Sequence, residues 1–385
     1  MTVNRLLGAL VATGLAFASS AFAQERPTIK IGGVLPQQGP LADSYGIPPM
    51  QGIQIAIDEI NAKGGIKGRK LKPVFRDDRT QIQGSVAAFQ ELAKNPEIAA
   101  IFGPALTGAA MAVRPIIDEN TIPQFSLNYG IGLVKDGFTY YYRMSPSLDI
   151  GNTAILAAAQ KKLGNGQKLA ILSSTDAGGT EGAADAVAQA PKFGMTVVAQ
   201  EKFQYGETDF TAQMTRIKAS GATVMLAITQ GIATNAAVRA ARQLGILQKL
   251  TIIGVSGLAD AQSVELAGNL LNGVILWDFV CIDDPSNPRI PPFLEAYKAK
   301  FKDGRVSPAV MNAYDAIKII AAGLEKVVDG DKPIDRVKLN AALNETKYQG
   351  FASFYNFTPA WHNGPQADQV ALCTYQDGKR LPFKP

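Results

Sequence analysis

Residues 52–71 read GIQIAIDEINAKGGIKGRKL, and this stretch decides the fold. Its isoleucines recur three and four positions apart, which predicts one buried face of a helix that begins near Pro48. Gly64-Gly65 then ends this helix. Apolar runs at 29–35 and 71–75 flank the helix and predict two buried strands. The region is therefore expected to place a helix against a parallel sheet.

The same alternation continues along the chain and predicts an α/β fold with helices on both faces of parallel sheets. Further strands are expected at 99–102, 122–126, 169–173, 196–203, 223–229, 251–255 and 274–280. Helices are expected at 81–94, from Thr107, and, in a second series that starts near Ile150, at 183–193, 210–219 and 231–244. Consecutive helices are expected within 293–345, and strands around a turn at Asn363-Gly364-Pro365 within 353–375. Two similar halves of the chain meet at 141–147. Pro115 lies inside the helix that is expected from Thr107 and should bend or shorten it.

The composition excludes several classes of protein. The 385 residues are 46% hydrophobic and 18% charged, which is enough chain for two domains and argues against disorder. One histidine and two cysteines are too few for a Cys/His zinc site or an iron–sulfur cluster, so we expect no metal and no cofactor. The net charge of +5 comes from scattered Lys and Arg, so no nucleic-acid partner is expected.

The N-terminus predicts export. Residues 1–23 carry Arg5, an apolar core at 6–17 and the small-x-small sequence Ala21-Phe22-Ala23, which are the parts of a signal peptide cleaved after Ala23. No cysteine lies near this point, so no lipid anchor is expected. Later apolar runs are too short to span a membrane, so we expect a soluble protein of the periplasm.

The two cysteines, Cys281 and Cys373, would reach an oxidising compartment after export. They could pair as a disulfide or remain two buried free thiols, because the sequence does not give the geometry on which pairing depends.

Motifs for catalysis and for phosphate binding are weak. His362 has no Gly-x-Ser-x-Gly elbow before it and is expected at the surface or at a cleft rim. Asp77-Asp78 would point to opposite faces of a strand, so the pair is expected to end the strand and cap a turn. The glycine-rich stretches 64–70 and 178–182 lack the spacing of a phosphate loop or a dinucleotide fingerprint.

Polar and small residues at the carboxyl ends of predicted strands are the better candidates, because open α/β sheets bind ligands there. The set draws on both halves of the chain and consists of Tyr45, Ala105, Leu106, Thr107, Asn128, Tyr129, Gly130, Asp176, Gly179, Gln230 and Ser256.

Specific motifs follow one another along the chain after residue 24. They are 29–35, Gly39-Pro40, Tyr45-Gly46, 52–71, 101–104, Ile122-Pro123, 143–145 and 205–210. In this order they resemble the periplasmic branched-chain amino-acid (Leu/Ile/Val) binding proteins of ABC importers. The string Ala-Ile-x-Glu-Ile-Asn-x-x-Gly-Gly-Ile-x-Gly-x-x-Leu within 56–71 is the most specific part of the resemblance.

The resemblance implies the type I periplasmic binding protein fold, in which two Rossmann-like lobes are joined by three crossover strands and close on a ligand. It implies lobe 1 at 24–143 and 283–357, lobe 2 at 147–280 and 360–385, and hinge crossovers at 143–148, 277–283 and 357–365. Cys281 and Cys373 would then both lie near a hinge.

The resemblance also assigns roles to the candidate residues. Thr107 would hold the ligand carboxylate at a helix N-terminus, with Ala105 and Leu106 in the loop before it. Asn128, Tyr129 and Gly130 match a second loop that completes the grip, and Tyr45 matches an aromatic cleft wall. This chain departs from the pattern in lobe 2, where Ser256 replaces an acidic residue and Gly179 and Gln230 replace tyrosines.

These departures favour a ligand without an ammonium group, because a buried ammonium needs a carboxylate partner. The hypothesis is an aromatic or branched aliphatic carboxylate, with Gly179 leaving room for a bulkier ligand. Asp176 as a substitute partner keeps a branched-chain amino acid open. We expect a monomer that serves an ABC permease and ATPase and is not an enzyme. The alternatives are an exported ligand sensor or a hydrolase on the same fold.

Overall fold

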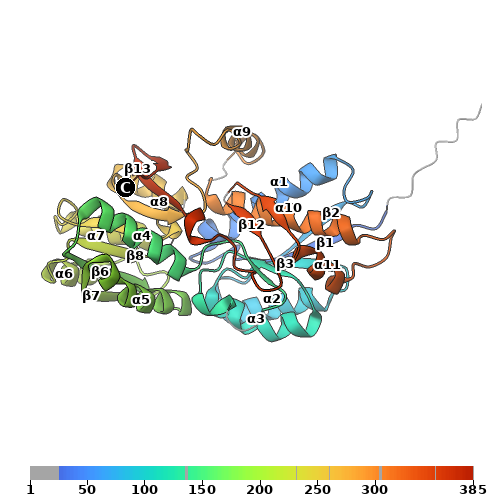
Figure 1. Ribbon diagram of the computed structural model, residues 1–385, viewed down its shortest axis with the longest axis horizontal. Helices are drawn as coiled ribbons and strands as arrows, with labels where there is room; N and C mark the ends of the chain where they lie inside the picture. Colours follow the sequence, from blue (N-terminus) through green and yellow to red (C-terminus); the bar gives the residue numbers. More distant parts are fainter. Residues whose placement is uncertain are drawn as a thin grey trace, which may run out of the picture.

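The computed structural model describes residues 26–134, 138–230, 232–259, 261–302, 306–351 and 353–384. These residues form two α/β bodies that lie side by side along the long axis of the molecule (Figure 1). We call the body that contains the five-stranded sheet lobe 1, and the body that contains the seven-stranded sheet lobe 2. The predicted signal peptide, residues 1–23, lies outside the described residues.

The sheet of lobe 1 has the strand order β2-β1-β3-β4-β5, and all paired strands are parallel. Its strands are β1 (Ile29–Val34), β2 (Leu71–Arg76), β3 (Ile98–Phe102), β4 (Gln124–Ser126) and β5 (Tyr141–Arg143). Helices α1 (Ile47–Ala62) and α10 (Pro308–Val327) cover one face, and α2 (Ile82–Lys94) and α3 (Thr107–Asn120) cover the other. Gly52 permits the close approach of α1 to α10, because a Cβ there would lie 2.1 Å from the carbonyl oxygen of Val310.

The sheet of lobe 2 has the order β14-β13-β10-β9-β8-β6-β7. Its strands are β6 (Gln167–Ser174), β7 (Met195–Phe203), β8 (Val224–Ile228), β9 (Thr251–Gly254), β10 (Ile275–Asp278), β13 (Ala371–Gln376) and β14 (Lys379–Pro382). Only β13 and β14 run antiparallel to their neighbours in this sheet, as far as the described residues show. Helices α4 (Leu148–Leu163) and α5 (Ala177–Gln189) cover one face, and α6 (Thr211–Ala219) and α7 (Ile232–Gln243) the other. The predicted α/β architecture is confirmed.

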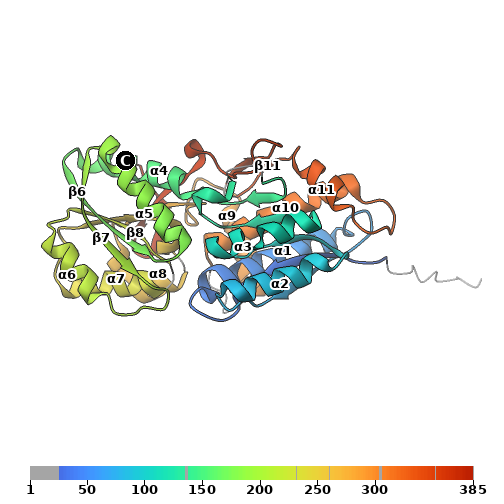
Figure 2. The same cartoon turned by 90° about the horizontal axis from the view of Figure 1, so that it is seen from below.

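The remaining elements complete the two lobes. They are α8 (Ala261–Ala267), α9 (Ile290–Lys300), α11 (Arg336–Leu343) and the two-stranded pair β11 (Lys347–Gln349) and β12 (Phe354–Asn356). Although α9 follows β10 of lobe 2, it contacts α1 of lobe 1, since the hydroxyl of Tyr297 donates to Gln51 Oε1 over 2.5 Å. Seen from below, α3 of lobe 1 and α5 of lobe 2 approach each other where the lobes meet (Figure 2).

Some predicted boundaries were wrong. The helix expected at 183–193 begins at Ala177, because the Asp176 side chain accepts hydrogen bonds from the first-turn amides of Gly178 and Gly179. Pro115 does not shorten α3, which continues to Asn120. By contrast, strands β12 and β13 do lie on either side of the predicted turn at 363–365, where β12 pairs with β11 and β13 pairs with β10 and β14.

The chain passes between the sheets three times, after β5, after β10 and after β12. Two of these passages touch, because Arg143 forms an isolated bridge with Asn363 and its amide donates to the carbonyl of His362. The exact lobe limits and hinge limits stay a prediction.

His362 is buried in the third passage, so its predicted position at the surface or at a cleft rim is wrong. Its ring stacks on Tyr142 with the centroids 4.5 Å apart, and its Nδ1 lies 3.1 Å from the carbonyl oxygen of Tyr141. Burial lowers the pKa of the imidazole below its usual 6.5. The residue therefore packs the third passage against β5 of lobe 1.

Cys281 and Cys373 form a disulfide, with their Cα atoms 5.6 Å apart. The bond ties the segment that leaves β10 to the neighbouring strand β13, so the alternative of two free thiols is excluded. It therefore fixes the C-terminal strands of lobe 2 to the start of the second passage.

Candidate functional site

A cavity lies between the lobes at the point where the strand order of each sheet reverses. In lobe 1 this point falls between β1 and β3, and in lobe 2 the order β7-β6-β8-β9-β10 places it between β6 and β8. The cavity contains about 440 Å³ of empty space, some of it open to solvent. It is lined by Tyr45, Ala105, Leu106, Thr107, Leu127, Tyr129, Leu148, Ser174, Asp176, Gly178, Gly179, Tyr205, Ile228, Gln230 and Val255. Eight of the eleven predicted site residues are therefore brought together here.

The lobe 1 side of the cavity is the N-terminus of α3. Thr107 is the first residue of this helix, and no side chain caps its first turn because the residue before it is Leu106. The uncapped amides and the helix dipole favour an anion at this end. Gly130 packs directly on Thr107, since a Cβ at Gly130 would lie 2.3 Å from the Thr107 methyl carbon. The threonine side chain is thereby held at the cavity wall.

The lobe 2 side is the N-terminus of α5, and here a carboxylate already occupies the end of the helix. Asp176 accepts from the amides of Gly178 and Gly179 over 3.2 and 3.1 Å, and from the hydroxyl of Ser174. The two helix ends lie close together, because a Cβ on Gly178 would be 3.0 Å from Thr107 Oγ1. The electrostatic result is a neutralised α5 terminus that faces an uncapped α3 terminus.

Gly179 lines the cavity, but the prediction that it leaves extra room for a ligand is wrong. A Cβ at this position would lie 2.3 Å from both the carbonyl oxygen and Oγ of Ser174. The glycine is required by the close approach of Ser174 at the end of β6, so its missing side chain is no measure of the size of the ligand.

Aromatic side chains form another wall. The hydroxyls of Tyr45 and Tyr129 are hydrogen-bonded over 2.7 Å, and the Tyr129 ring packs edge-on against Trp277 at 5.3 Å. Phe279 lies parallel to Tyr129 at 6.0 Å. Burial raises the pKa of Tyr129, so its phenol stays neutral and serves as a hydrogen-bonding group.

Three predicted residues do not line this cavity. Asn128 is buried and braces the loop, because its side-chain amide donates to the carbonyl of Ala105 and its own carbonyl accepts from the Ser145 hydroxyl. Gly130 packs against Thr107, which does line the cavity. Ser256 lines a separate, smaller cavity on the other side of Tyr45.

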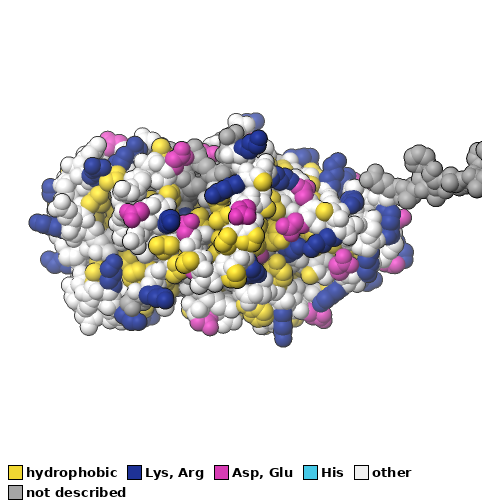
Figure 3. Space-filling view, turned by 90° about the horizontal axis from the view of Figure 1, so that it is seen from above, with side chains coloured by type: hydrophobic (Ala, Val, Ile, Leu, Met, Phe, Trp, Pro, Cys, Tyr) yellow, Lys and Arg dark blue, Asp and Glu magenta, His cyan; other side chains and the backbone are white. Residues whose placement is uncertain are grey.

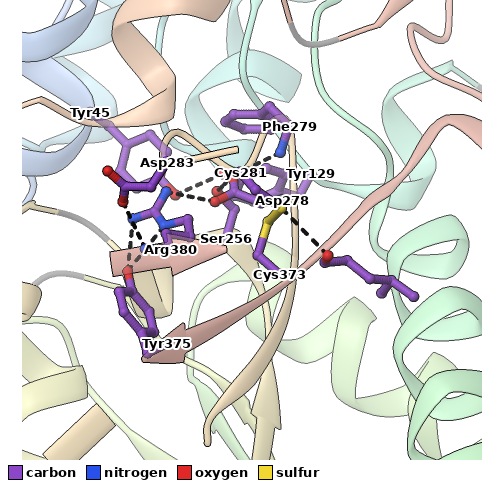
Figure 4. Close-up of polar contacts among 11 residues, drawn as sticks. Tyr45, Tyr129, Ser256, Asp278, Phe279, Cys281, Asp283, Cys373, Tyr375 and Arg380 are labelled. Atoms are coloured by element: carbon purple, nitrogen blue, oxygen red, sulfur yellow. Dashed lines mark hydrogen bonds and ion pairs between the residues drawn. A yellow bond between two sulfur atoms is a disulfide. The ribbon is translucent and has the colours of Figure 1, made fainter. Parts of the chain in front are cut away.

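A buried ion pair near the cavity was missed by the sequence analysis (Figure 4). Asp278 at the end of β10 is fully buried, and its Oδ2 accepts from Arg380 of β14 over 2.7 Å. Its Oδ1 accepts from the Ser256 hydroxyl and from the Phe279 amide, each over 2.7 Å. Burial raises the pKa of Asp278, and the Arg380 guanidinium opposes this shift. The carboxylate is therefore already paired.

The lobes also contact each other beside the cavity. Glu181 of α5 accepts a 2.7 Å hydrogen bond from the amide of Ile131, which opens the short helical turn η2 (Ile131–Val134) of lobe 1. This bond joins the two lobes next to both helix ends.

Other lining residues could have been found from strand ends alone. Ser174, Ile228 and Val255 each end or directly follow a strand of lobe 2, as the predicted candidates do. Tyr205 follows β7 by two residues, as Gln230 follows β8, so the same rule could have found it. Leu148 carried no such signal, because it lies in the first turn of α4.

The described part of the chain gives little support for a metal site or a membrane span. Within it, no group of three or more His, Cys, Asp or Glu side chains could hold a metal ion. No helix among the described residues is long and apolar enough to cross a membrane. Asp77 and Asp78 directly follow β2 and accept from the Arg79 and Thr80 amides in the turn, as predicted. On the face shown in Figure 3, Lys and Arg are scattered among Asp and Glu, and hydrophobic side chains gather towards the middle.

Comparisons with known sequences agree with this architecture. The chain is 30% identical over 328 residues to Leu/Ile/Val-binding protein BraC3 of Rhizobium johnstonii, with 85% of each chain covered. It is 28% identical over 349 residues to Leu/Ile/Val-binding protein homolog 3 of Brucella melitensis, with 90% of each covered. These relatives are named as binding proteins and not as enzymes.

Solved structures share the fold. A Streptococcus pneumoniae branched-chain amino acid transporter substrate binding protein, LivJ, in complex with isoleucine has a TM-score of 0.79 at 23% identity, covering 93% of this chain and 100% of that one. An R. palustris ABC transporter solute binding protein in complex with benzoate has a TM-score of 0.81 at 20% identity, covering 92% and 95%. A model of the periplasmic binding protein family matches residues 28–379. The resemblance seen in the sequence is thus confirmed, and the chain belongs to the periplasmic binding protein family.

Proposed function

We propose that this protein binds a small organic acid between its lobes and delivers it to an ABC import permease. The observation that carries the proposal is the contrast between the two helix ends at the cavity. The N-terminus of α3 at Thr107 is uncapped, whereas that of α5 is capped by Asp176. A ligand carboxylate would accept hydrogen bonds from the α3 amides and the Thr107 hydroxyl.

The charges around the cavity favour an acid over an amino acid. The buried carboxylate of Asp278 is paired with Arg380, so it offers no free negative charge to an ammonium group. The other carboxylate, Asp176, accepts hydrogen bonds from two amides and a hydroxyl. An ammonium group enclosed here would compete with these donors for Asp176, the one carboxylate among the described residues that line the cavity.

Isothermal titration calorimetry of the purified protein tests the proposal. Benzoate and short aliphatic acids are compared with leucine and isoleucine, and Thr107→Val is compared with Thr215→Val on α6 as a remote control. We expect acids to bind and Thr107→Val to weaken their binding by about tenfold to 150-fold, since hydrogen bonds to charged groups contribute roughly 1.5–3 kcal/mol. Leucine binding with no acid binding would refute the acid assignment.

A branched-chain or other aliphatic amino acid is the second candidate, because Asp176 does line the cavity. The Leu/Ile/Val-binding names of the relatives favour it as well. In that case Asp176→Asn would abolish leucine binding, whereas an acid would bind the variant at least as tightly. The same variant therefore separates the two candidates.

Localisation, assembly and lack of catalysis are parts of the same proposal. Export with cleavage after Ala23 predicts a mature chain that begins at Gln24, which mass spectrometry of the periplasmic fraction would detect. We propose a monomer, which light scattering measures directly. Conversion of a bound acid into a product would favour the hydrolase alternative, and a neighbouring receptor gene in place of permease and ATPase genes would favour the sensor.

A further inference from the structure

A second, smaller cavity lies behind Tyr45, whose side chain lines both cavities. It contains about 220 Å³ of empty space, part of it open to solvent. Its walls carry three serines, Ser44, Ser256 and Ser307, together with Phe279 and the first turn of α10. Figure 4 shows Tyr45, Ser256 and Phe279 around the Asp278 carboxylate. We call this space the serine chamber.

Two of the hydroxyls in the serine chamber lack a partner. Ser44 and Ser307 are each 3% exposed, and Oγ of each makes no hydrogen bond to any residue that the structure describes. Buried hydroxyls are nearly always hydrogen-bonded, since an unsatisfied one has lost its water without replacement. Two such hydroxyls lining one cavity are therefore available to a polar group that enters it.

The start of α10 gives the serine chamber a preference for an acceptor. Ser307 is the N-cap residue of this 20-residue helix, yet its side chain does not cap the first turn. The first helical residue, Pro308, has no amide hydrogen to donate, and the next residue, Ala309, lines the serine chamber. The positive end of the helix dipole and two hydroxyl donors therefore face the same space.

The third serine, Ser256, is hydrogen-bonded to the nearest negative charge, the Asp278 carboxylate. Ser256 donates its hydroxyl hydrogen to Asp278, whose other oxygen is paired with Arg380. The Ser256 oxygen is left as a neutral group beside a compensated carboxylate. The serine chamber thus offers hydroxyl donors and a helix N-terminus, with no unpaired carboxylate among its lining residues.

We propose that the serine chamber is a subsite for a second oxygen function of the ligand, reached past Tyr45. This inference rests on the proposed function, in which the first carboxylate binds at the N-terminus of α3. The ligand class it names is a carboxylic acid that carries a further carboxylate, carbonyl or hydroxyl at its far end. The N-termini of α3 and α10 would hold the two oxygen groups on either side of the Tyr45 ring.

The test compares matched acids that differ only in the second oxygen. Calorimetry is run with benzoate, 3- and 4-hydroxybenzoate and terephthalate, and with hexanoate and adipate. We expect at least one oxygenated acid to bind about tenfold more tightly than its parent. Ser44→Ala and Ser307→Ala should each weaken that acid by about threefold to tenfold and leave the parent within about twofold.

Ser353→Ala is the matched control, because Ser353 is also buried with an unpartnered hydroxyl but lines neither cavity. None of the three substitutions removes a described hydrogen bond, so all should fold, as a thermal melt would show. Equal binding of parent and oxygenated acids, or equal responses to all three variants, would mean that the chamber holds only water and would overturn the inference. Absence of binding by every acid would instead refute the proposed function.

Discussion

The hydrogen bond between Glu181 and the Ile131 amide should help to hold the lobes together. It spans 2.7 Å, joins α5 of lobe 2 to η2 of lobe 1 and has an ionised acceptor. Hydrogen bonds to charged groups contribute about 1.5–3 kcal/mol, and the half-buried position of Glu181 reduces this to about 1–1.5 kcal/mol. Glu181→Ala should therefore lower the ratio of closed to open molecules by about fivefold to twelvefold.

The effect is measurable before any ligand is identified. Small-angle X-ray scattering of the ligand-free protein should give a larger radius of gyration for Glu181→Ala than for the wild type. Once a ligand is known, its apparent Kd should rise by no more than the same factor, because only the closed population changes. The exposed Glu325→Ala on α10 is the control for the loss of one negative charge. If both variants scatter like the wild type, the bond does not contribute to closure and the reasoning fails.

Three further predictions concern stability. Replacing Cys281 and Cys373 by serine should lower the free energy of unfolding by about 4–5 kcal/mol, because the disulfide closes a sequence separation of 92 residues. In urea titrations, a reductant should destabilise the wild type by the same amount and leave the stability of the variant unchanged. Because burial lowers the pKa of His362, the unfolded chain binds more protons below about pH 6.5, so stability should fall as the pH drops through this range. His362→Asn should flatten that pH dependence, and an unchanged slope would contradict the assignment. Arg380→Met should lower the free energy of unfolding by about 3–5 kcal/mol, because it leaves the buried Asp278 carboxylate unpaired, and adding Asp278→Asn should restore part of that stability. A double variant no more stable than the single variant would argue against a stabilising ion pair.

Local sequence patterns predicted most of the fold because each strand and helix is encoded over a short stretch. The isoleucine spacing in 53–60 and the glycines at 64 and 65 place α1 and its end within one or two residues. The candidate residues followed from one rule, that ligands bind at the carboxyl ends of parallel strands. Thr107, Asp176 and Gln230 all come from this rule, and all three line the cavity.

The features that were missed depend on contacts between distant parts of the chain. Asp278 and Arg380 are 102 residues apart, and they meet because β13 and β14 return antiparallel to the edge of the second sheet. His362 is buried because two passages between the lobes touch at Arg143, which its flanking residues do not reveal. The contact that a Cβ at Gly179 would make with Ser174 likewise appears only in the folded chain.

The position of Arg380 on the last strand has a consequence for how the protein is made. Synthesis proceeds from the N-terminus, so the Asp278 carboxylate is complete about a hundred residues before its guanidinium partner emerges. Lobe 2 therefore cannot reach its final charge balance until Arg380 has been synthesised. A truncation before Lys379 should yield an unstable lobe, and a C-terminal affinity tag needs a linker that leaves β14 free to pair with β13.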